Sequence, residues 1–137
     1  MTAKEYLQQI RKLDILITQR RKELEELRLQ DGVRGISYEG DRVQTSPKGE
    51  ANYVRLVEKR AKLEGEINEL ITELYELRHK IINEIQLLDN DVYTDILYKR
   101  YVEYMSLERI AVEMHYSYFH TCKLHGGALK ELERKIL

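Results

Sequence analysis

The chain has 137 residues, which is enough for one ordinary domain or two small ones. Its 23 basic and 24 acidic side chains nearly cancel, so any affinity for nucleic acid has to come from a local patch. One proline and seven glycines are too few for the many turns of an all-β fold, and no apolar run approaches the about 20 residues of a membrane span. Cys122 is the only cysteine, which excludes an intramolecular disulfide. Together with an N-terminus that has no apolar signal core, this favours a cytoplasmic protein without membrane contact.

Residues 2–30 predict a helix with a coiled-coil seam, because apolar side chains recur at heptad spacing and Arg20 fills the one skipped position. The seam consists of Tyr6, Ile10, Leu13, Ile17, Leu24 and Leu27. Leu7, Ile15 and Leu16 lie beside it and widen the apolar stripe. We therefore expect this helix to contact more than one partner helix.

Residues 31–49 predict a loop, since four of the seven glycines and the only proline fall there. Ser46 directly before Pro47 is typical of an N-cap followed by proline at the first helical position. Residues 50–89 return to the heptad pattern and predict a second long helix, with Arg60 and Glu84 as polar interruptions of its seam.

Two seamed helices joined by a loop predict an antiparallel coiled-coil hairpin over residues 1–89. Such a hairpin leaves one side of each seam open to water, so we expect a homo-oligomer. The residues assigned to this core and to oligomerisation are Leu56, Leu63, Ile67, Leu70, Leu74, Leu77 and Ile81.

Residues 90–137 predict a second, smaller domain of three helices, at about 92–103, 107–114 and 118–135. Ser106 and Ser117 are the expected N-caps of the last two helices. Only three residues separate these two helices, which is typical of a helix-turn-helix. The fold class predicted for the whole chain is therefore all-α. The tyrosines expected to fill the small core of this domain are Tyr93, Tyr98, Tyr101 and Tyr104.

The segment LYKRYVEYMSLERIAVEMHYSYFHTCKLHGGALKEL resembles the C-terminal helix-turn-helix of bacterial sigma factors, which reads the upstream promoter element. Thr121 stands where the sigma pattern has a β-branched apolar residue, and Gly126 and Gly127 predict a weakened recognition helix. The residues that carry the resemblance are Ile110, Ala111, Met114, Ser117, Leu124, Ala128, Leu129 and Leu132.

The whole chain is similar to a family of small phage and prophage proteins of low-GC Gram-positive bacteria, which join a helical hairpin to a sigma-like end. These proteins carry a characteristic loop, which here reads Gly40-Asp41-Arg42-Val43-Gln44-Thr45-Ser46-Pro47. The resemblance implies a phage-type transcriptional regulator that acts on double-stranded DNA, on RNA polymerase, or on both.

A DNA-reading helix needs side chains that reach base edges and cations that reach phosphates. No acid occurs between Glu113 and Glu131, so the start of the last helix is the expected DNA-binding surface. The residues placed for base edges are Tyr118, Phe119, His120, Cys122 and Lys123, and those placed for phosphates are Arg109, His125 and Lys130. The three histidines of this window (His115, His120 and His125) are expected to strengthen binding at low pH by gaining charge together.

Two alternatives stay open: a structural or protein-interaction protein without DNA binding, and a small DNA-packaging subunit. His120 and His125 point about 140° apart on a helix, so with Cys122 they form no metal site. No phosphate-binding glycine loop, pair of catalytic carboxylates or hydrolase triad is visible. We therefore expect neither a cofactor nor an enzymatic activity.

Overall fold

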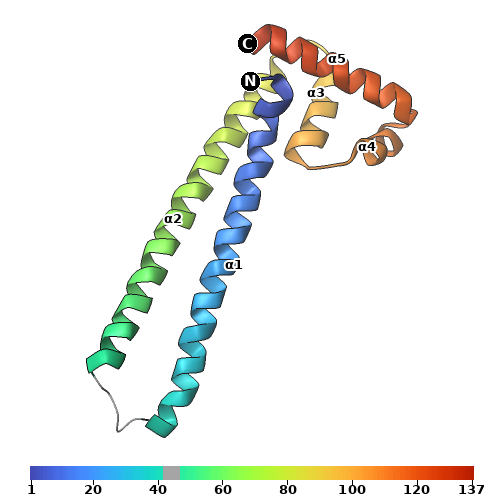
Figure 1. The fold of residues 1–137 in the computed structure, drawn as a ribbon. Coiled ribbons are helices and arrows are strands. Elements are labelled where there is room, and N and C mark those ends of the chain that lie inside the picture. Colours follow the sequence, from blue (N-terminus) through green and yellow to red (C-terminus); the bar gives the residue numbers. More distant parts are fainter. Residues whose placement is uncertain (42–46) are drawn as a thin grey trace. The chain divides into compact units, whose positions relative to one another are not determined.

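The structure is a computed structural model that describes the backbone of residues 1–41 and 47–137, with side chains described outside residues 31–48. The predicted all-α class is confirmed, and the described residues contain no strand (Figure 1). The elements in chain order are α1 (Ala3–Asp41), α2 (Pro47–Gln86), α3 (Asp91–Leu97), the π-helical turn η1 (Tyr98–Val102), α4 (Leu107–Met114) and α5 (Tyr118–Ile136).

The predicted loop over residues 31–49 is too long. Helix α1 continues to Asp41 and α2 already begins at Pro47. Glycine lowers helix stability by only about 1 kcal/mol per residue, so Gly32 and Gly35 do not end a helix that is already formed. Ser46, with its predicted capping role, and the Arg42–Ser46 part of the family-like motif lie outside the described residues.

The chain forms two compact units, and both long helices contribute to each of them. The terminal unit consists of Met1–Asp14 and Glu73–Leu137, and the paired-helix unit consists of Ile15–Thr72. The sequence places a boundary at residue 89 instead, which stays a prediction. By contacts, the start of α1 and the end of α2 group with the C-terminal helices.

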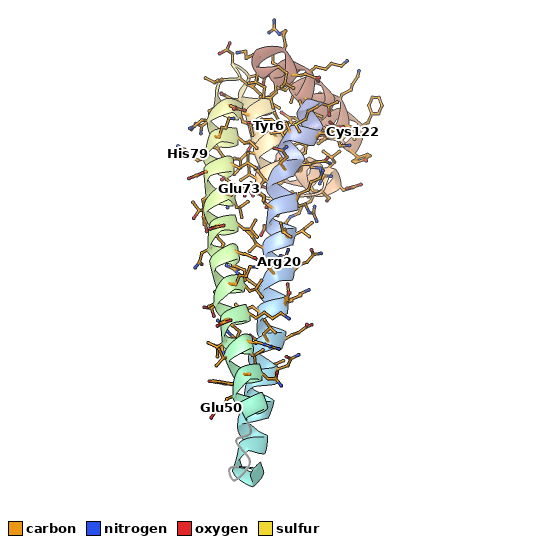
Figure 2. The ribbon with its side chains drawn as sticks, turned by 60° about the vertical axis from the view of Figure 1, so that its left-hand side comes forward. Tyr6, Arg20, Glu50, Glu73, His79 and Cys122 are labelled. Carbon is orange, nitrogen blue, oxygen red and sulfur yellow. The ribbon has the colours of Figure 1, made fainter. Side chains whose placement is uncertain are left out.

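In the paired-helix unit, α1 and α2 lie side by side and run in opposite directions (Figure 1). Leu24, Leu63 and Ile67 are buried between them, and the half-buried Leu27 and Ile71 pack against this cluster. At the seam position without an apolar residue, the exposed side chain of Arg20 pairs with Glu23 at 3.1 Å (Figure 2). Within one chain, each of the two helices thus contributes one stripe to this core.

The terminal unit contains the most deeply buried seam residues. Ile10 and Ile81 are fully buried, and so is Leu7, which lies beside the seam as predicted for a helix with more than one partner. The two neighbours predicted to widen the stripe with Leu7 differ from it, because Leu16 is half-buried and Ile15 is exposed. Within this unit, the burial of Leu7 shows that the first turns of α1 are covered on more than one side.

A polar pair interrupts the seam of the terminal unit. The Tyr6 hydroxyl and Oε2 of Glu84 are both buried without a well-aligned hydrogen bond among the described residues. Burial and the adjacent Glu84 carboxylate raise the pKa of Tyr6 well above its ordinary value. The phenol is therefore neutral at any physiological pH.

Residues predicted as the oligomerisation core divide into two groups. Leu63, Ile67, Leu74 and Ile81 are buried within the chain itself. Leu56, Leu70 and Leu77 are half-buried at the edges of the same stripe. The first group is thus already used by the fold, whereas the second group is partly open to another chain.

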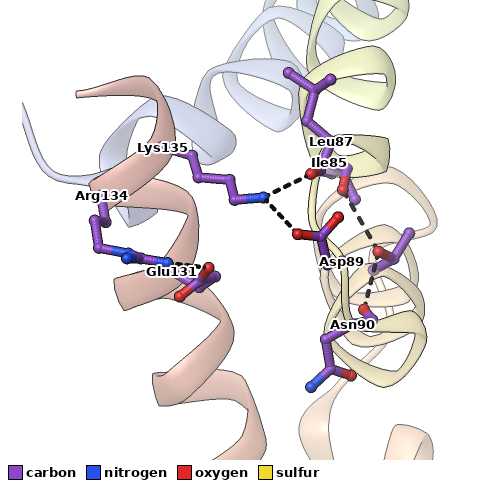
Figure 3. A network of polar contacts seen from close by, with 8 residues as sticks. Ile85, Leu87, Asp89, Asn90, Glu131, Arg134 and Lys135 are labelled. Carbon is purple, nitrogen blue, oxygen red and sulfur yellow. Dashed lines mark hydrogen bonds and ion pairs between the residues drawn. The ribbon is translucent and has the colours of Figure 1, made fainter.

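The residues that directly follow α2 contact the start of α3 and the end of α5. The Asn90 side chain caps α3 by accepting hydrogen bonds from the backbone N–H groups of Val92 and Tyr93, at 3.0 and 3.3 Å. Near the C-terminus, Lys135 Nζ donates to the Leu87 carbonyl at 2.9 Å and lies 3.3 Å from Asp89 Oδ2 (Figure 3). These two contacts hold the end of α5 against the turn between α2 and α3.

Candidate nucleic-acid interface

The candidate interface is built on α4, a three-residue turn and α5, whose bounds match the predicted ranges within one residue. Ser106 and Ser117 act as the predicted N-caps, since their Oγ atoms accept hydrogen bonds from the N–H groups three residues on, at 3.2 and 3.1 Å. His115 ends α4 in the left-handed conformation, with φ of 60°. The next N–H, that of Tyr116, bonds the Ala111 carbonyl at 2.9 Å. These backbone contacts set the angle between α4 and α5.

The inner face of α5 holds the helix against α3 and α4. Ala128 and Leu132 are fully buried, and Leu124 packs on the cluster formed by Ile96, Met105 and Ile110. Thr121, where the sigma pattern has an apolar residue, is 0% exposed and donates its hydroxyl proton to the Ser117 carbonyl at 2.9 Å. The polar atom is satisfied, so the methyl group of Thr121 fills the apolar position at little cost.

Gly126 and Gly127 do not interrupt α5, which is helical from Tyr118 to Ile136. A Cβ atom at Gly127 would lie 2.7 Å from the hydroxyl of Tyr93, whereas a Cβ at Gly126 would meet nothing within 4 Å. The second glycine is therefore explained by the close approach of α3, and the first is not explained by packing.

The outer face of the first two turns of α5 carries the residues predicted to reach base edges. Tyr118, Phe119, His120 and Lys123 are exposed, Phe119 by 74%. The Lys123 ammonium lies 5.7 Å from the centroid of the Phe119 ring, and the His120 ring meets the Tyr116 ring edge-on at 5.0 Å. One aromatic and cationic surface results.

Cys122 is half-buried at the edge of this surface (Figure 2). Its thiol raises the pKa of the neighbouring Tyr118 phenol, which therefore stays protonated. Among the described residues, no group of three or more His, Cys, Asp or Glu side chains is placed to hold a metal ion.

The residues predicted to reach phosphates are not equivalent. Arg109 and Lys130 are exposed on α4 and α5. His125 is half-buried instead, stacks on Tyr101 of η1, and shares a 2.8 Å hydrogen bond with the Tyr101 hydroxyl. Burial, followed by the charges of Arg100 and Lys4, lowers the pKa of His125. His125 thus gains charge at lower pH than expected, and the predicted joint titration of three histidines is wrong for this residue.

Two features near this surface were not predicted from the sequence. Val112 on α4 is 77% exposed, an apolar side chain just outside the inward-facing pattern of its helix. Lys99 of η1 lies 2.8 Å from Glu113 and 3.4 Å from Asp95. The contact with Glu113 raises the pKa of Lys99 and lowers that of Glu113. Glu113, the acid at which the acid-free window of the sequence begins, therefore has a cation of its own, which the sequence spacing of 14 residues does not reveal.

Comparison of the chain with models of protein families, with curated proteins and with solved structures finds no match. Within the described residues, no helix combines the length and the apolar character needed to cross a membrane.

Proposed function

We propose that the protein binds double-stranded DNA through the exposed face of the first two turns of α5 and acts as a phage-type transcriptional regulator. The observation that carries the proposal is the placement of Tyr118, Phe119, His120 and Lys123 on one exposed face at the start of a helix. A helix-turn-helix protein inserts this part of its second helix into the major groove. Arg109 and Lys130 supply cations for the flanking phosphates.

The charge balance predicts weak binding by a single chain. Phosphate contacts dominate affinity for DNA, and the interface offers few cations. A regulator of this kind needs a second copy or a partner such as RNA polymerase to reach useful affinity. Val54 and Val57 of the paired-helix unit are apolar and exposed on α2, which supports the binding of a second copy there. Light scattering at micromolar concentration tests this step, and a mass near the 16.4 kDa of one chain would contradict it.

The protein-interaction alternative is favoured by one specific observation. Val112 and Phe119 are the most exposed apolar side chains near the α4–α5 turn. Apolar side chains of this kind are typical anchors of a protein interface. The DNA-packaging alternative shares the proposed DNA contact and differs in binding without sequence preference.

The decisive experiment compares Lys123→Glu with Lys80→Glu, which makes the same charge change at an exposed position on α2. Fluorescence anisotropy on promoter fragments from the protein's own genome, at several salt concentrations, gives affinity and salt dependence. We expect Lys123→Glu to weaken binding by at least about 100-fold and Lys80→Glu by less than about threefold.

His120→Ala is expected to change the preference among fragments more than the overall affinity, because an imidazole in the groove reads base edges. If the protein binds all fragments equally and Lys123→Glu abolishes this binding, the DNA-packaging alternative takes the place of the regulator. If no fragment binds and Lys123→Glu has no effect, α5 is not a DNA reader and the protein-interaction alternative takes its place.

A further inference from the structure

A small cavity lies in the terminal unit between the first turns of α1 and the π-helical turn η1. Its volume is about 40 Å³, which is room for about three atoms of the size of a water oxygen. It is lined by Leu7, Gln8, Arg11, Arg100, Tyr101 and Tyr104. The lining residues include two arginines, one glutamine and two tyrosines, and none of them is acidic. The walls therefore offer mainly hydrogen-bond donors.

The surroundings of this cavity carry an excess of positive charge. Lys4 and Arg100 act on His125, and Arg11 and Arg78 act on Tyr104. The nearby acid, Asp14, accepts a hydrogen bond from the Tyr104 hydroxyl at 2.8 Å. Four cationic side chains thus act on Tyr104 and His125, which favours an anion at this site.

The donors around the cavity are held in place by the protein itself. Nη1 of Arg100 donates to the Met105 carbonyl at 2.9 Å, and the guanidinium of Arg11 lies 5.5 Å above the centroid of the Tyr104 ring. Tyr104 has a φ of 61°, a strained conformation for a residue with a side chain. Backbone strain and π-helical turns both occur preferentially at ligand sites. A site whose donors are fixed before binding loses little entropy when its ligand arrives.

We propose that this cavity binds a small oxyanion, the terminal group of a free phosphate or phosphate monoester, between the guanidinium groups of Arg11 and Arg100. The planar guanidinium presents parallel N–H donors that match two oxygens of such an anion, and Gln8 and Tyr104 add further polar contacts at the wall. The volume suits the oxygen atoms of one anionic group. A phosphodiester inside a nucleic-acid strand has two of its oxygens blocked and needs room for the strand on both sides. The proposal is independent of the DNA-binding proposal, because none of its residues belongs to the first turns of α5.

The test uses the full chain and inorganic phosphate, titrated at constant ionic strength against chloride. Calorimetry gives the affinity, and proton NMR follows the imidazole of His125, which contacts Tyr101 and lies near Arg100 and Lys4. We expect saturable binding of phosphate and a rise in the pKa of His125 on saturation, because the anion offsets the two cations that lower it. A pKa of His125 that stays constant at saturation would place the anion elsewhere and overturn the proposal.

Three variants distinguish a specific binding site from non-specific electrostatic attraction. Arg11→Gln removes an exposed guanidinium that lies over the Tyr104 ring, and we expect a loss of affinity of about tenfold or more. Arg21→Gln removes an exposed guanidinium of the same helix in the paired-helix unit and should leave the affinity within about twofold. Arg100→Lys keeps the positive charge but removes the parallel N–H donors of the planar guanidinium, and it should also weaken binding.

Equal losses in Arg11→Gln and Arg21→Gln, or no saturable binding, would overturn the proposal. A short DNA duplex in the same titration distinguishes the source of the phosphate. If the duplex shifts His125 and free phosphate does not, the cavity serves the nucleic-acid backbone and the free-oxyanion proposal is wrong.

Discussion

The two units of the molecule use the same kind of sequence in different ways. In the paired-helix unit, the heptad residues Leu24, Leu63 and Ile67 are buried, and their neighbours on the same stripe are half-buried. In the terminal unit, heptad residues of the same two helices, such as Ile10 and Ile81, are fully buried. The heptad pattern determines which face of a helix turns inward. The number of layers packed against that face determines how far it is buried.

The difference has an energetic consequence. Removing methyl groups costs most where the surroundings cannot collapse into the space left behind. The terminal unit contains fully buried side chains such as Ile10, Ile81 and Ile96, whereas the core cluster of the paired-helix unit is flanked by half-buried side chains. We therefore expect the two units to respond differently to the same substitution.

The largest effect is expected for Ile96→Ala, with Ile67→Ala as its counterpart in the paired-helix unit. Ile96 is fully buried in the cluster with Met105 and Ile110, and its truncation should cost about 4 kcal/mol of unfolding free energy. Ile67→Ala makes the same change in helix propensity but should cost about 2 kcal/mol. Urea denaturation followed by circular dichroism measures both. Equal losses would show that the stripe of the paired-helix unit is closed in solution, for instance by a second copy.

A smaller effect separates the two adjacent glycines of α5. Gly126→Ala should stabilise the protein by about 0.5–1 kcal/mol, because alanine is the better helix former and the site is open. Gly127→Ala gains the same helix propensity, but it forces the Tyr93 hydroxyl to move away from the new Cβ. Its melting temperature should therefore lie below that of Gly126→Ala. The reverse order would mean that Tyr93 does not pack on α5 as described.

The smallest effect is expected from pH. Burial lowers the pKa of His125 in the folded chain, whereas the unfolded chain binds the proton near the ordinary value of about 6.5. Below that pH the unfolded state carries more protons, so stability falls as the solution is acidified from pH 8 to pH 5. His125→Gln should flatten this dependence, and His79→Gln, at an exposed position of α2, should not. Identical pH profiles for wild type and His125→Gln would contradict the burial of this imidazole.

Local signals in the sequence predicted much of the fold. Ser106 and Ser117 each supply a side-chain oxygen next to an apolar helical pattern, and both cap the helices predicted from them. The same logic failed at residues 31–49, because glycines lower helix stability without forbidding a helix. Local cues therefore locate helix starts better than they locate helix ends.

The candidate site could be predicted only in part, for a physical reason. Exposure of Tyr118, Phe119, His120 and Lys123 follows from the period of α5 and the position of its inner face. The inward position of His125 depends on Tyr101, which lies 24 residues away on η1. The ion pair of Lys99 with Glu113 likewise joins elements whose packing no local pattern encodes. Tertiary contacts of this kind decide which charges remain available to a ligand.

The π-helical turn η1 gives the chain a particular sensitivity to length. The N–H of Glu103 bonds the Tyr98 carbonyl five residues back, at 3.1 Å, so the turn holds one residue more than an α-helical turn does. Deleting one residue between Tyr98 and Val102 would replace the π-helical turn by an α-helical one and change which side chains of this turn face inward. Tyr101 would leave His125 and Arg100 would leave the Met105 carbonyl. A gene that lost this one codon would keep its reading frame and its helices but lose the oxyanion cavity.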